Sequence, residues 1–333
     1  MKRYNNQIGL IAAPDNLRLA FFKAQRSKLG KQEVQDYRAD LHHNLALLRE
    51  ALLNETVSVG DYHYFKVFDP KERQICAAAF PERVLHHAIM NVCHAHFEQK
   101  QIYHSYATRP EKGTFKALAQ AYRNSKRYPW FLKMDFRKYF DSISHPVLME
   151  KLERLYKDQV LLRLFQKIVD SYAVSPEKGL PIGNLTSQYF ANYFLAALDH
   201  RTIEVWGAPA YVRYMDDIVI WGQTKTILKE IGSRFEEASA EIGLRLKPKV
   251  LNRSRNGLPF LGFRIYPESI RLAKRSKRRY QRKMKAYFGK LNAQEWEQST
   301  FQRHVLPLTS FVAHADSLGF RNRVLNHLAG EVP

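Results

Sequence analysis

Two adjacent carboxylates, Asp216 and Asp217, lie inside a mostly apolar stretch of the chain. The surrounding residues 211–221 are rich in β-branched and aromatic types, which predicts a strand, a tight turn carrying the acids and a second strand. Two like charges side by side repel each other unless a cation binds there. Mg²⁺ is the natural cation, because it takes carboxylate oxygens and keeps positions open for phosphate. For this segment alone, a solvated acidic turn is the alternative.

A third acid in a matching setting favours the metal site. Asp135 ends a short, mostly apolar segment that begins at Phe131, which predicts a strand, and a helical segment with Pro146 near its start follows. Only the fold can bring Asp135 to the two later acids. If both strands lie centrally in one sheet, the acids can share two Mg²⁺ ions. Such a pair stabilises the attacking and leaving oxygens of an in-line displacement at phosphorus.

The charge of the chain predicts a nucleic-acid partner. It has 53 Lys and Arg against 32 Asp and Glu, a formal net charge of +21. Such an excess attracts phosphates, with an affinity that falls as salt rises. A basic helical stretch at 274–285 suits the backbone of a duplex, and a solvated face is its alternative. The candidate contacts in this stretch are Lys274, Arg275, Lys277 and Arg278.

Six motifs in order, over residues 60–320, resemble those of reverse transcriptases. Asp135 with Phe140, and then Tyr214 to Asp217, resemble the two catalytic palm motifs. The other four segments resemble the first fingers motifs, the next fingers motif, the template-and-nucleotide loop and the primer-grip hairpin. They are residues 65–88, 106–113, 180–188 and 260–265.

This resemblance implies roles for the acids and their neighbours. Asp135, Asp216 and Asp217 would be catalytic and, with the backbone carbonyl of Phe136, would hold two Mg²⁺ ions, for which Mn²⁺ can substitute. We expect Asp217 to act less directly, supporting the turn or the metal from behind. Phe140 would be the steric gate that rejects a 2′-hydroxyl, and an ordinary buried Phe is the alternative.

The resemblance also implies residues that bind the nucleotide and the nucleic acid. Arg73 would bind the triphosphate, because a guanidinium keeps its charge and bonds bidentately. Lys249 is a candidate general acid for the leaving pyrophosphate, although the register leaves Lys247 as an alternative. The remaining nucleotide-binding candidates are Ile182, Gly183 and Gln188. The nucleic-acid candidates outside the basic stretch are Arg109, Phe260, Leu261 and Gly262.

Two positions of the 180–188 loop indicate a particular subfamily of reverse transcriptases. Most group II intron-like relatives carry Gln-Gly near its start and Ser-Pro near its end, whereas this chain has Ile182 and Gln188. This pattern, with a late thumb motif at 310–317, resembles the reverse transcriptases of diversity-generating retroelements. The resemblance implies error-prone copying at adenines of a template-repeat RNA. It also implies a structured template RNA, a cDNA or RNA primer, dNTPs and a small basic accessory variability protein, single or oligomeric.

Ile182 also has a physical interpretation. An apolar, β-branched side chain packs but neither donates nor accepts a hydrogen bond, unlike Gln. Losing a bond that favours correct geometry lowers discrimination by about 1–3 kcal/mol. We therefore expect Ile182 to contribute to low fidelity, and a packed core Ile is the alternative.

The predicted elements fit a right-hand polymerase fold of the α+β class. It would have an N-terminal helical extension at 1–60, fingers and palm at 61–265, with a ferredoxin-like sheet carrying the acids, and a helical thumb at 266–333. We expect strands at 62–68 and near Leu244. We expect helices at 14–28, 33–54, 82–98, 114–124, 146–170, 186–205 and 226–242, and a mostly helical end from 274.

The sequence predicts a protein of the reducing cytoplasm, and the resemblance implies a bacterial, archaeal or phage origin. Cys76 and Cys93 form no Cys-x-x-Cys pair, and we expect no signal peptide, membrane span or membrane partner. The histidines of residues 86–96 invite a zinc site, but on a helix they spread over several faces.

Three alternatives to the mutagenic polymerase stay open. An ordinary-fidelity group II intron-like reverse transcriptase is disfavoured by Ile182 and Gln188. A viral RNA-dependent RNA polymerase is disfavoured by Phe140. A non-catalytic RNA-binding scaffold has no need of three acids at one repelling site.

Overall fold

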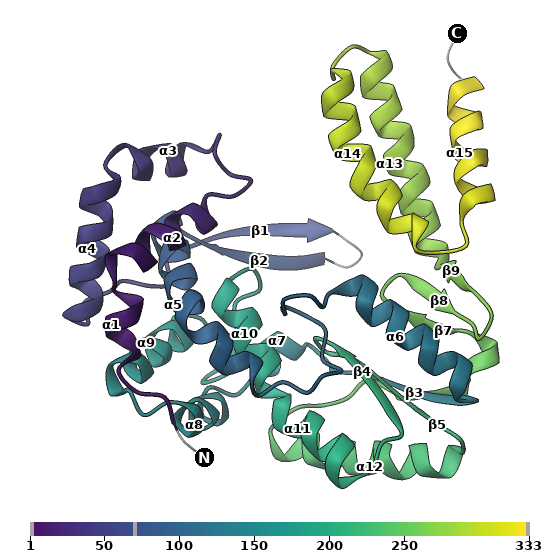
Figure 1. Ribbon diagram of the computed structural model, residues 1–333, viewed down its shortest axis with the longest axis horizontal. Coiled ribbons are helices and arrows are strands. Elements are labelled where there is room, and N and C mark those ends of the chain that lie inside the picture. The colour runs from purple at the N-terminus through teal and green to yellow at the C-terminus, as the bar shows by residue number, and fades with distance from the viewer. Residues whose placement is uncertain (1–2, 69–71, 331–333) are drawn as a thin grey trace. The chain divides into compact units, whose positions relative to one another are not determined.

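Helices and strands alternate along most of the chain, and helices alone form its C-terminal part (Figure 1). This computed structural model describes residues 3–68 and 72–330. The predicted α+β class is confirmed. The chain divides into two compact units, the first of residues 1–103, 136–205 and 234–247, and the second of residues 104–135, 206–233 and 248–333. No helix in the described ranges is long and apolar enough to cross a membrane.

The first unit is mainly helical. Four N-terminal helices precede a hairpin of β1 (Tyr62–Phe68) and β2 (Glu72–Ala78), and the longest helix of the unit, α5, follows. The N-terminal helices are α1 (Gln7–Ile11), α2 (Pro14–Ala24), α3 (Gln32–Ala39) and α4 (Leu41–Leu53). The later helices of the unit are α5 (Phe80–Glu98), α7 (Tyr139–Ser142), α8 (His145–Leu155), α9 (Gln159–Asp170), α10 (Leu185–Phe194), α11 (Ala196–His200), the π-helix η1 (Arg201–Val205) and the second half of α12 (Lys225–Glu241).

Three predicted helices are interrupted. The helix expected at 33–54 breaks at Asp40, and the one expected at 186–205 becomes α10, α11 and η1. The helix expected at 146–170 breaks before Asp158. Asp158 is 5% exposed, and its carboxylate accepts from the backbone N–H groups of Leu161, Gln7 and Ile8. The spacing of apolar residues does not reveal such breaks, because a capping side chain interrupts a helix without changing that spacing.

A four-stranded antiparallel sheet forms the centre of the second unit, in the order β4-β5-β3-β6. Its strands are β4 (Ala210–Tyr214), β5 (Asp217–Gly222), β3 (Trp130–Asp135) and β6 (Val250–Arg253). The prediction that the two acid-bearing strands lie centrally is confirmed. The strand expected near Leu244 is wrong: Leu244 follows the positive-φ Gly243 in the turn after α12, where its N–H donates to the Ser239 carbonyl.

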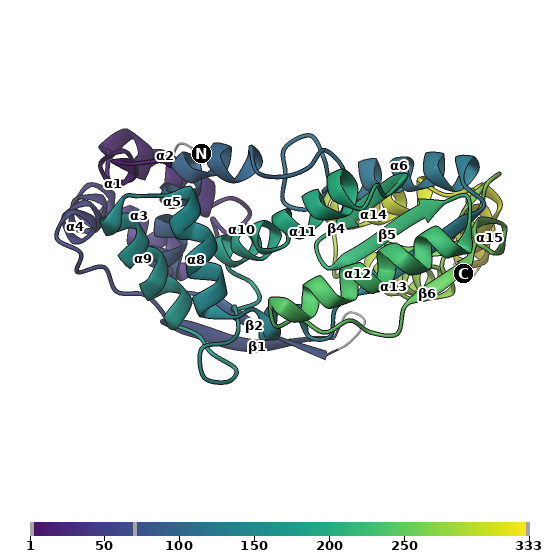
Figure 2. The ribbon, with the colours of Figure 1, turned by 90° about the horizontal axis from the view of Figure 1, so that it is seen from below.

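Helices cover both faces of this sheet (Figure 2). On one face, α6 (Thr114–Arg127) packs against β4, and the Trp221 indole donates to Ser125 of α6. On the other face, the backbone of α12 at Gly232 lies against Leu132. Because side chains alternate along a strand, Phe131, Lys133 and Asp135 share the face covered by α6.

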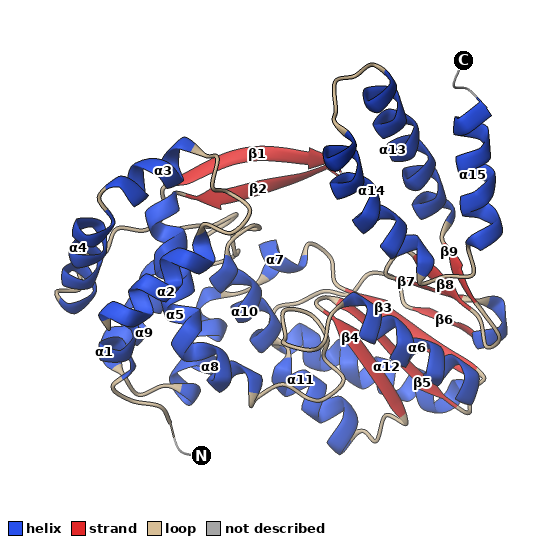
Figure 3. Ribbon diagram, turned by 45° about the horizontal axis from the view of Figure 1, so that its top comes forward, coloured by secondary structure: helices blue, strands red, loops and turns tan. Residues whose placement is uncertain are grey.

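Three short strands connect the sheet to the C-terminal helices (Figure 3). They are β7 (Leu258–Phe260), β8 (Phe263–Ile265) and β9 (Ile270–Leu272), and the helices are α13 (Lys274–Asn292), α14 (Gln298–Ala313) and α15 (Leu318–Gly330). The mostly helical end predicted from 274 is confirmed through 330, and residues 331–333 lie outside the described residues.

The Phe311 ring packs 4.8 Å from that of Phe263, and the Asp316 N–H donates to the Ile270 carbonyl. Residues 310–317 thus join the helices to the small sheet.

The turn between β7 and β8 demands a glycine. Phe260 pairs with Phe263, so Leu261 and Gly262 form a two-residue turn, and both have positive φ, as a type I′ turn requires. A Cβ on Gly262 would lie 3.0 Å from the Ser276 Oγ and 3.1 Å from the Phe311 ring. The hairpin is therefore fitted tightly against α13 and α14.

We expect Gly262→Ala to lower the free energy of unfolding by about 1–3 kcal/mol, because it adds backbone strain and close contacts. Gly289→Ala is the matched control, since Gly289 lies in α13 with nothing within 4 Å of an added Cβ. That control should stabilise the protein by about 0.5–1 kcal/mol. Urea unfolding measures both, and equal effects of the two substitutions would contradict this account of the turn.

Candidate active site

The three predicted acids meet at one end of the central strand pair. Asp135 ends β3, Asp217 begins β5, and the register pairs them directly. Directly opposed residues of antiparallel strands have Cβ atoms about 4.5–5.5 Å apart. Tyr214 pairs with Asp217, so Asp216 lies in the two-residue turn with Met215. The strand–turn–strand prediction for 211–221 is confirmed.

A buried arginine braces this turn. Met215 has a φ of 56°, a left-handed conformation that is costly for a non-glycine residue. Arg213 is fully buried on β4, and its Nη1 donates to the Met215 carbonyl at 3.1 Å. The Arg213 backbone bonds to His104 and Tyr106. Sequence reasoning missed Arg213, although a lone charged residue inside an apolar strand signals a buried partner.

A lysine also missed from the sequence neutralises part of the acid cluster. Lys133 lies two residues before Asp135 on the same face of β3, and its Nζ is 3.0 Å from the Asp217 Oδ2. The same Nζ donates to the Pro259 carbonyl at 2.8 Å. The signal in the sequence was its spacing of two from Asp135, which puts both side chains on one face.

The electrostatics of Asp217 fit a bound cation. Burial and the charges of Asp135 and Asp216 raise the pKa of Asp217, the Lys133 ammonium lowers it, and the resulting pKa is about 6. The other carboxylate oxygen, Oδ1, is buried and has no hydrogen-bond partner among the described residues. An unsatisfied, repelled carboxylate is a suitable ligand for a hard cation.

The described side chains do not form a complete cage of three or more His, Cys, Asp or Glu groups. This suits Mg²⁺ at a phosphoryl-transfer site, because the ion takes one or two carboxylates and completes its shell with water and substrate phosphates. The acid cluster therefore fits a metal site that is finished by its substrate.

The nucleic-acid candidates lie in the same unit as the acids. Arg109 Nη1 donates to the Ser105 carbonyl at 2.7 Å. Leu261 and Gly262 form the turn of the β7–β8 hairpin, and Phe260 is its last β7 residue. The four basic candidates lie exposed on the first turns of α13: Lys274, Arg275, Lys277 and Arg278.

The Lys249 side chain contacts α12 rather than the acids. Its Nζ donates to the Gly232 carbonyl of α12 at 3.3 Å. Because α12 covers the face of the sheet opposite to that of Asp135, Lys249 would have to leave this contact to reach a nucleotide at the acids. Its role as the general acid stays a prediction.

Two of the nucleotide-binding candidates in the first unit, Phe140 and Ile182, are held by backbone hydrogen bonds. The Phe140 carbonyl accepts from the Leu180 N–H, and the Ile182 carbonyl accepts from the Cys76 N–H at 2.8 Å. Gly183 has a φ of 128°, and a Cβ there would lie 2.9 Å from the Cys76 carbonyl oxygen. Arg73 is exposed on β2, and Gln188 is half-buried on α10. These contacts join β2, α7 and the 180–188 loop.

The histidines of α5 have separate surroundings rather than a common centre. His94 bonds to the Tyr189 hydroxyl, His96 stacks on Tyr4, and His86 lies 3.4 Å from Glu82. Cys76 and Cys93 are both buried free thiols. These contacts give the histidines structural roles in the first unit.

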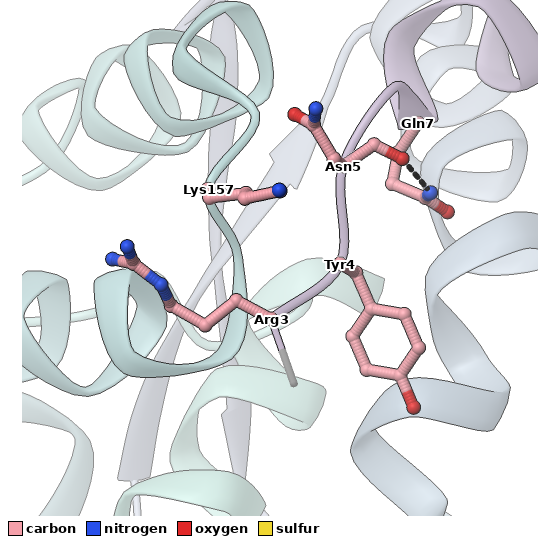
Figure 4. A pocket seen from close by; sticks show the side chains of 5 residues that line it. All are labelled: Arg3, Tyr4, Asn5, Gln7 and Lys157. Carbon is pink, nitrogen blue, oxygen red and sulfur yellow. Dashed lines mark hydrogen bonds between the residues drawn. The ribbon is translucent and has the colours of Figure 1, made fainter. Parts of the chain in front are cut away.

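Two cavities in the first unit are lined by polar side chains. One, of about 710 Å³, lies at the N-terminal segment between Arg3 and Lys157 (Figure 4), and no predicted site residue lines it. The other, of about 890 Å³, is lined by Lys28, Arg83, Gly183 and Asn184 among others. The second cavity therefore borders the predicted nucleotide loop.

The segments that carry the acids lie within a match to a known protein family. The sequence model of the family described as reverse transcriptase (RNA-dependent DNA polymerase) matches residues 69–265. The chain is 30% identical over 104 residues to the COX1/OXI3 intron 2 protein of Saccharomyces cerevisiae, which covers 29% of this chain and 12% of that protein. It is 23% identical over 281 residues to protein YkfC of Escherichia coli K12, covering 68% and 72%. The chain thus spans about an eighth of the yeast intron protein.

A solved structure shares the fold. The telomerase of Candida tropicalis, in complex with a fragment of telomeric RNA, superposes with a TM-score of 0.50 at 12% identity. The match covers 83% of this chain and 57% of the telomerase chain. At this identity the likeness concerns the fold, and it confirms the predicted right-hand polymerase fold.

We expect Asp217→Asn to stabilise the metal-free protein at high pH. The raised pKa means that the native state holds this proton more tightly than the unfolded chain. The resulting stability is fully present below about pH 4 and is lost as the pH rises through about 6. At pH 8 the variant should therefore exceed the wild type by on the order of 2 kcal/mol, and the gap should close below pH 4.

Urea unfolding in EDTA across this pH range measures the gap. Glu268→Gln, which removes an exposed carboxyl in the same unit, should show no such pH dependence. A gap of equal size at pH 4 and pH 8 would contradict the titration of Asp217 as its cause.

Proposed function

Because the chain belongs to the reverse transcriptase (RNA-dependent DNA polymerase) family, we propose that it extends a primer with dNTPs by copying an RNA template into cDNA. The observation that carries this proposal is the pairing of Asp135 with Asp217 beside Asp216 in the turn. A binding scaffold gains nothing from such repulsion, whereas a polymerase uses it to bind metal.

The acids have the following roles in this proposal. Asp135, Asp216 and the Phe136 carbonyl would hold divalent metal, and Asp217 would support the turn or the metal from behind. Two Mg²⁺ ions, or Mn²⁺ in their stead, would supply Lewis-acid stabilisation of the charge on the reacting phosphate. The primer 3′-hydroxyl oxygen forms a bond to the α-phosphorus of the dNTP, the hydroxyl proton passes to solvent water, and the bond from the α-phosphorus to the leaving pyrophosphate breaks. Lys249, or Lys247 in its place, gives a proton to the pyrophosphate.

The candidates of the first unit would select the nucleotide. Arg73 binds the triphosphate, Phe140 excludes the 2′-hydroxyl, and Ile182, Gly183 and Gln188 border the base and the sugar. Phe260, Leu261 and Gly262 hold the primer end. Arg109 and the basic turns of α13 bind the template–primer backbone, with salt-sensitive affinity. In this scheme residues 61–265 are fingers and palm, 266–333 the thumb and 1–60 a helical extension.

We further propose that the product is error-prone at template adenines, as in diversity-generating retroelements. Ile182, Gln188 and residues 310–317 support this subfamily. The resemblance to that subfamily implies a template-repeat RNA with its own primer and a small basic accessory variability protein, in a bacterial, archaeal or phage-infected cytoplasm. The alternative is an ordinary-fidelity intron-like enzyme, which the similarity to an intron-encoded protein favours.

Primer extension on an adenine-containing RNA template, with sequencing of the cDNA, tests both the polymerase activity and the errors opposite adenine. Asp135→Asn and Asp216→Asn should each lower synthesis by about 100-fold or more while RNA binding is retained, because the amide keeps the shape and loses the charge. Asp217→Asn should have a smaller effect. Glu268→Gln should leave synthesis unchanged, and an active Asp216→Asn enzyme would refute the metal assignment.

Ile182→Gln, or Ile182→Asn, should reduce misincorporation opposite template adenine by about 10- to 100-fold, since it restores a hydrogen-bonding group at the nucleotide. The bond from Cys76 to the Ile182 carbonyl involves backbone atoms, so the substitution leaves it intact. Ile182→Val is the matched control and should keep the wild-type error rate. An unchanged error rate in Ile182→Gln would contradict a role of Ile182 in fidelity. Faithful cDNA from the wild-type protein would contradict its assignment to the diversity-generating subfamily.

A further inference from the structure

Lys133 occupies an unusual position for a lysine. It lies on β3, a central strand of the sheet, between the buried Leu132 and Met134, and its side chain is only 19% exposed. Lysine is rarely buried without a partner, because its ammonium group loses hydration. A residue at this position therefore needs strong compensating contacts.

One ammonium group makes two such contacts, to different elements. Its Nζ lies 3.0 Å from the Asp217 Oδ2 at the start of β5 and 2.8 Å from the Pro259 carbonyl in β7. It also lies 5.8 Å from the centre of the Phe260 ring. Lys133 thus connects the acid end of the sheet to the β7–β8 hairpin.

The hairpin itself is anchored at its other end. The Gly262 carbonyl accepts from the Ser276 hydroxyl at 2.6 Å and from the Ala273 N–H at 3.1 Å. The Leu261–Gly262 turn is therefore fixed to the start of α13. Lys133 fixes the β7 strand of the hairpin at Pro259 and binds Asp217 with the same ammonium group.

We propose that Lys133 is a positioning residue that sets the distance between the β7–β8 hairpin and the acids. This rests on the proposed function, in which the hairpin holds the primer end and the acids hold the metal. With the hairpin tied to Asp217, a primer end that is seated on it meets the acids in reacting position. Misplacement by about 1 Å is enough to cost about 100-fold in rate.

The same geometry gives the proposal a distinctive signature. A positive charge beside Asp217 also opposes the binding of a divalent cation at the acid cluster. Removing the charge should therefore weaken the seating of the primer and strengthen the binding of metal. General damage to the sheet would instead weaken both.

Lys133→Met removes the charge and the donors but keeps a long side chain. Lys133→Arg keeps both, and Lys126→Met removes one exposed lysine from α6 as a control for net charge. Each variant is assayed for single-nucleotide extension over a Mg²⁺ series. Each is also titrated with Mn²⁺ by electron paramagnetic resonance, and with a primer ending in 2-aminopurine, whose fluorescence reports seating without catalysis.

In Lys133→Met we expect the extension rate at saturating Mg²⁺ to fall about tenfold or more and the primer end to seat less firmly. Its half-saturating Mn²⁺ concentration should fall about threefold. Lys133→Arg should restore the rate to within about threefold, because it retains the charge-assisted bonds. Lys126→Met should behave as the wild type in extension rate and seating.

Wild-type extension and seating in Lys133→Met would overturn the proposal. Weakened Mn²⁺ binding in Lys133→Met without rescue by arginine would also overturn it, since that pattern indicates a damaged sheet. A wild-type protein that seats the primer and binds Mn²⁺ without extending the primer would refute the proposed polymerase activity instead. In that case the primer and Mn²⁺ titrations of the variants would still test the positioning role of Lys133.

Discussion

The repulsion among three carboxylates at the end of one antiparallel strand pair is the constraint on which the site depends. Asp135 and Asp217 face each other because β3 and β5 pair in a single register. A shift of one residue would turn one acid to the opposite face of the sheet. The register is enforced by burial on both faces, with Leu132 toward α12 and Phe131 in the core on the α6 side.

Two basic side chains make this arrangement tolerable in the folded protein. Lys133 neutralises Asp217 at 3.0 Å, and Arg213 holds the turn through the Met215 carbonyl. Neither compensates the cluster fully, because the pKa of Asp217 is still raised and its Oδ1 is unsatisfied within the described chain. A protein that keeps such a residual cost at a sheet end has a use for it, and metal binding is the use that the chemistry favours.

Two loops of the proposed machinery are held through their own backbone carbonyls. The Ile182 carbonyl accepts from the Cys76 N–H, and the Gly262 carbonyl accepts from the Ala273 N–H and the Ser276 hydroxyl. Side chains such as Ile182 can therefore change without loss of the local structure. In the proposed function, such a division between backbone frame and side-chain surface would let one polymerase fold support different fidelities.

The sequence by itself determined the acid-bearing strands, the strand at 62–68, the helical C-terminal part and the family. These follow from local patterns: alternation along strands, periodicity along helices, and motifs whose residues are close in the chain. The tertiary structure alone decided which residues compensate the acids. Lys133 and Asp217 come from distant segments and meet through the pairing of β3 with β5, and Pro259 reaches Lys133 from the separate β7-β8-β9 sheet.

The interruptions of the predicted helices also depend on contacts between distant segments of the chain. Asp158 ends one predicted helix because its carboxylate also binds N–H groups of the N-terminal segment about 150 residues earlier. Lys249 likewise matched a family pattern in sequence, and its observed contact with Gly232 depends on the packing of α12. Local composition sets which elements form, whereas long-range contacts set where they end and what their polar side chains bind.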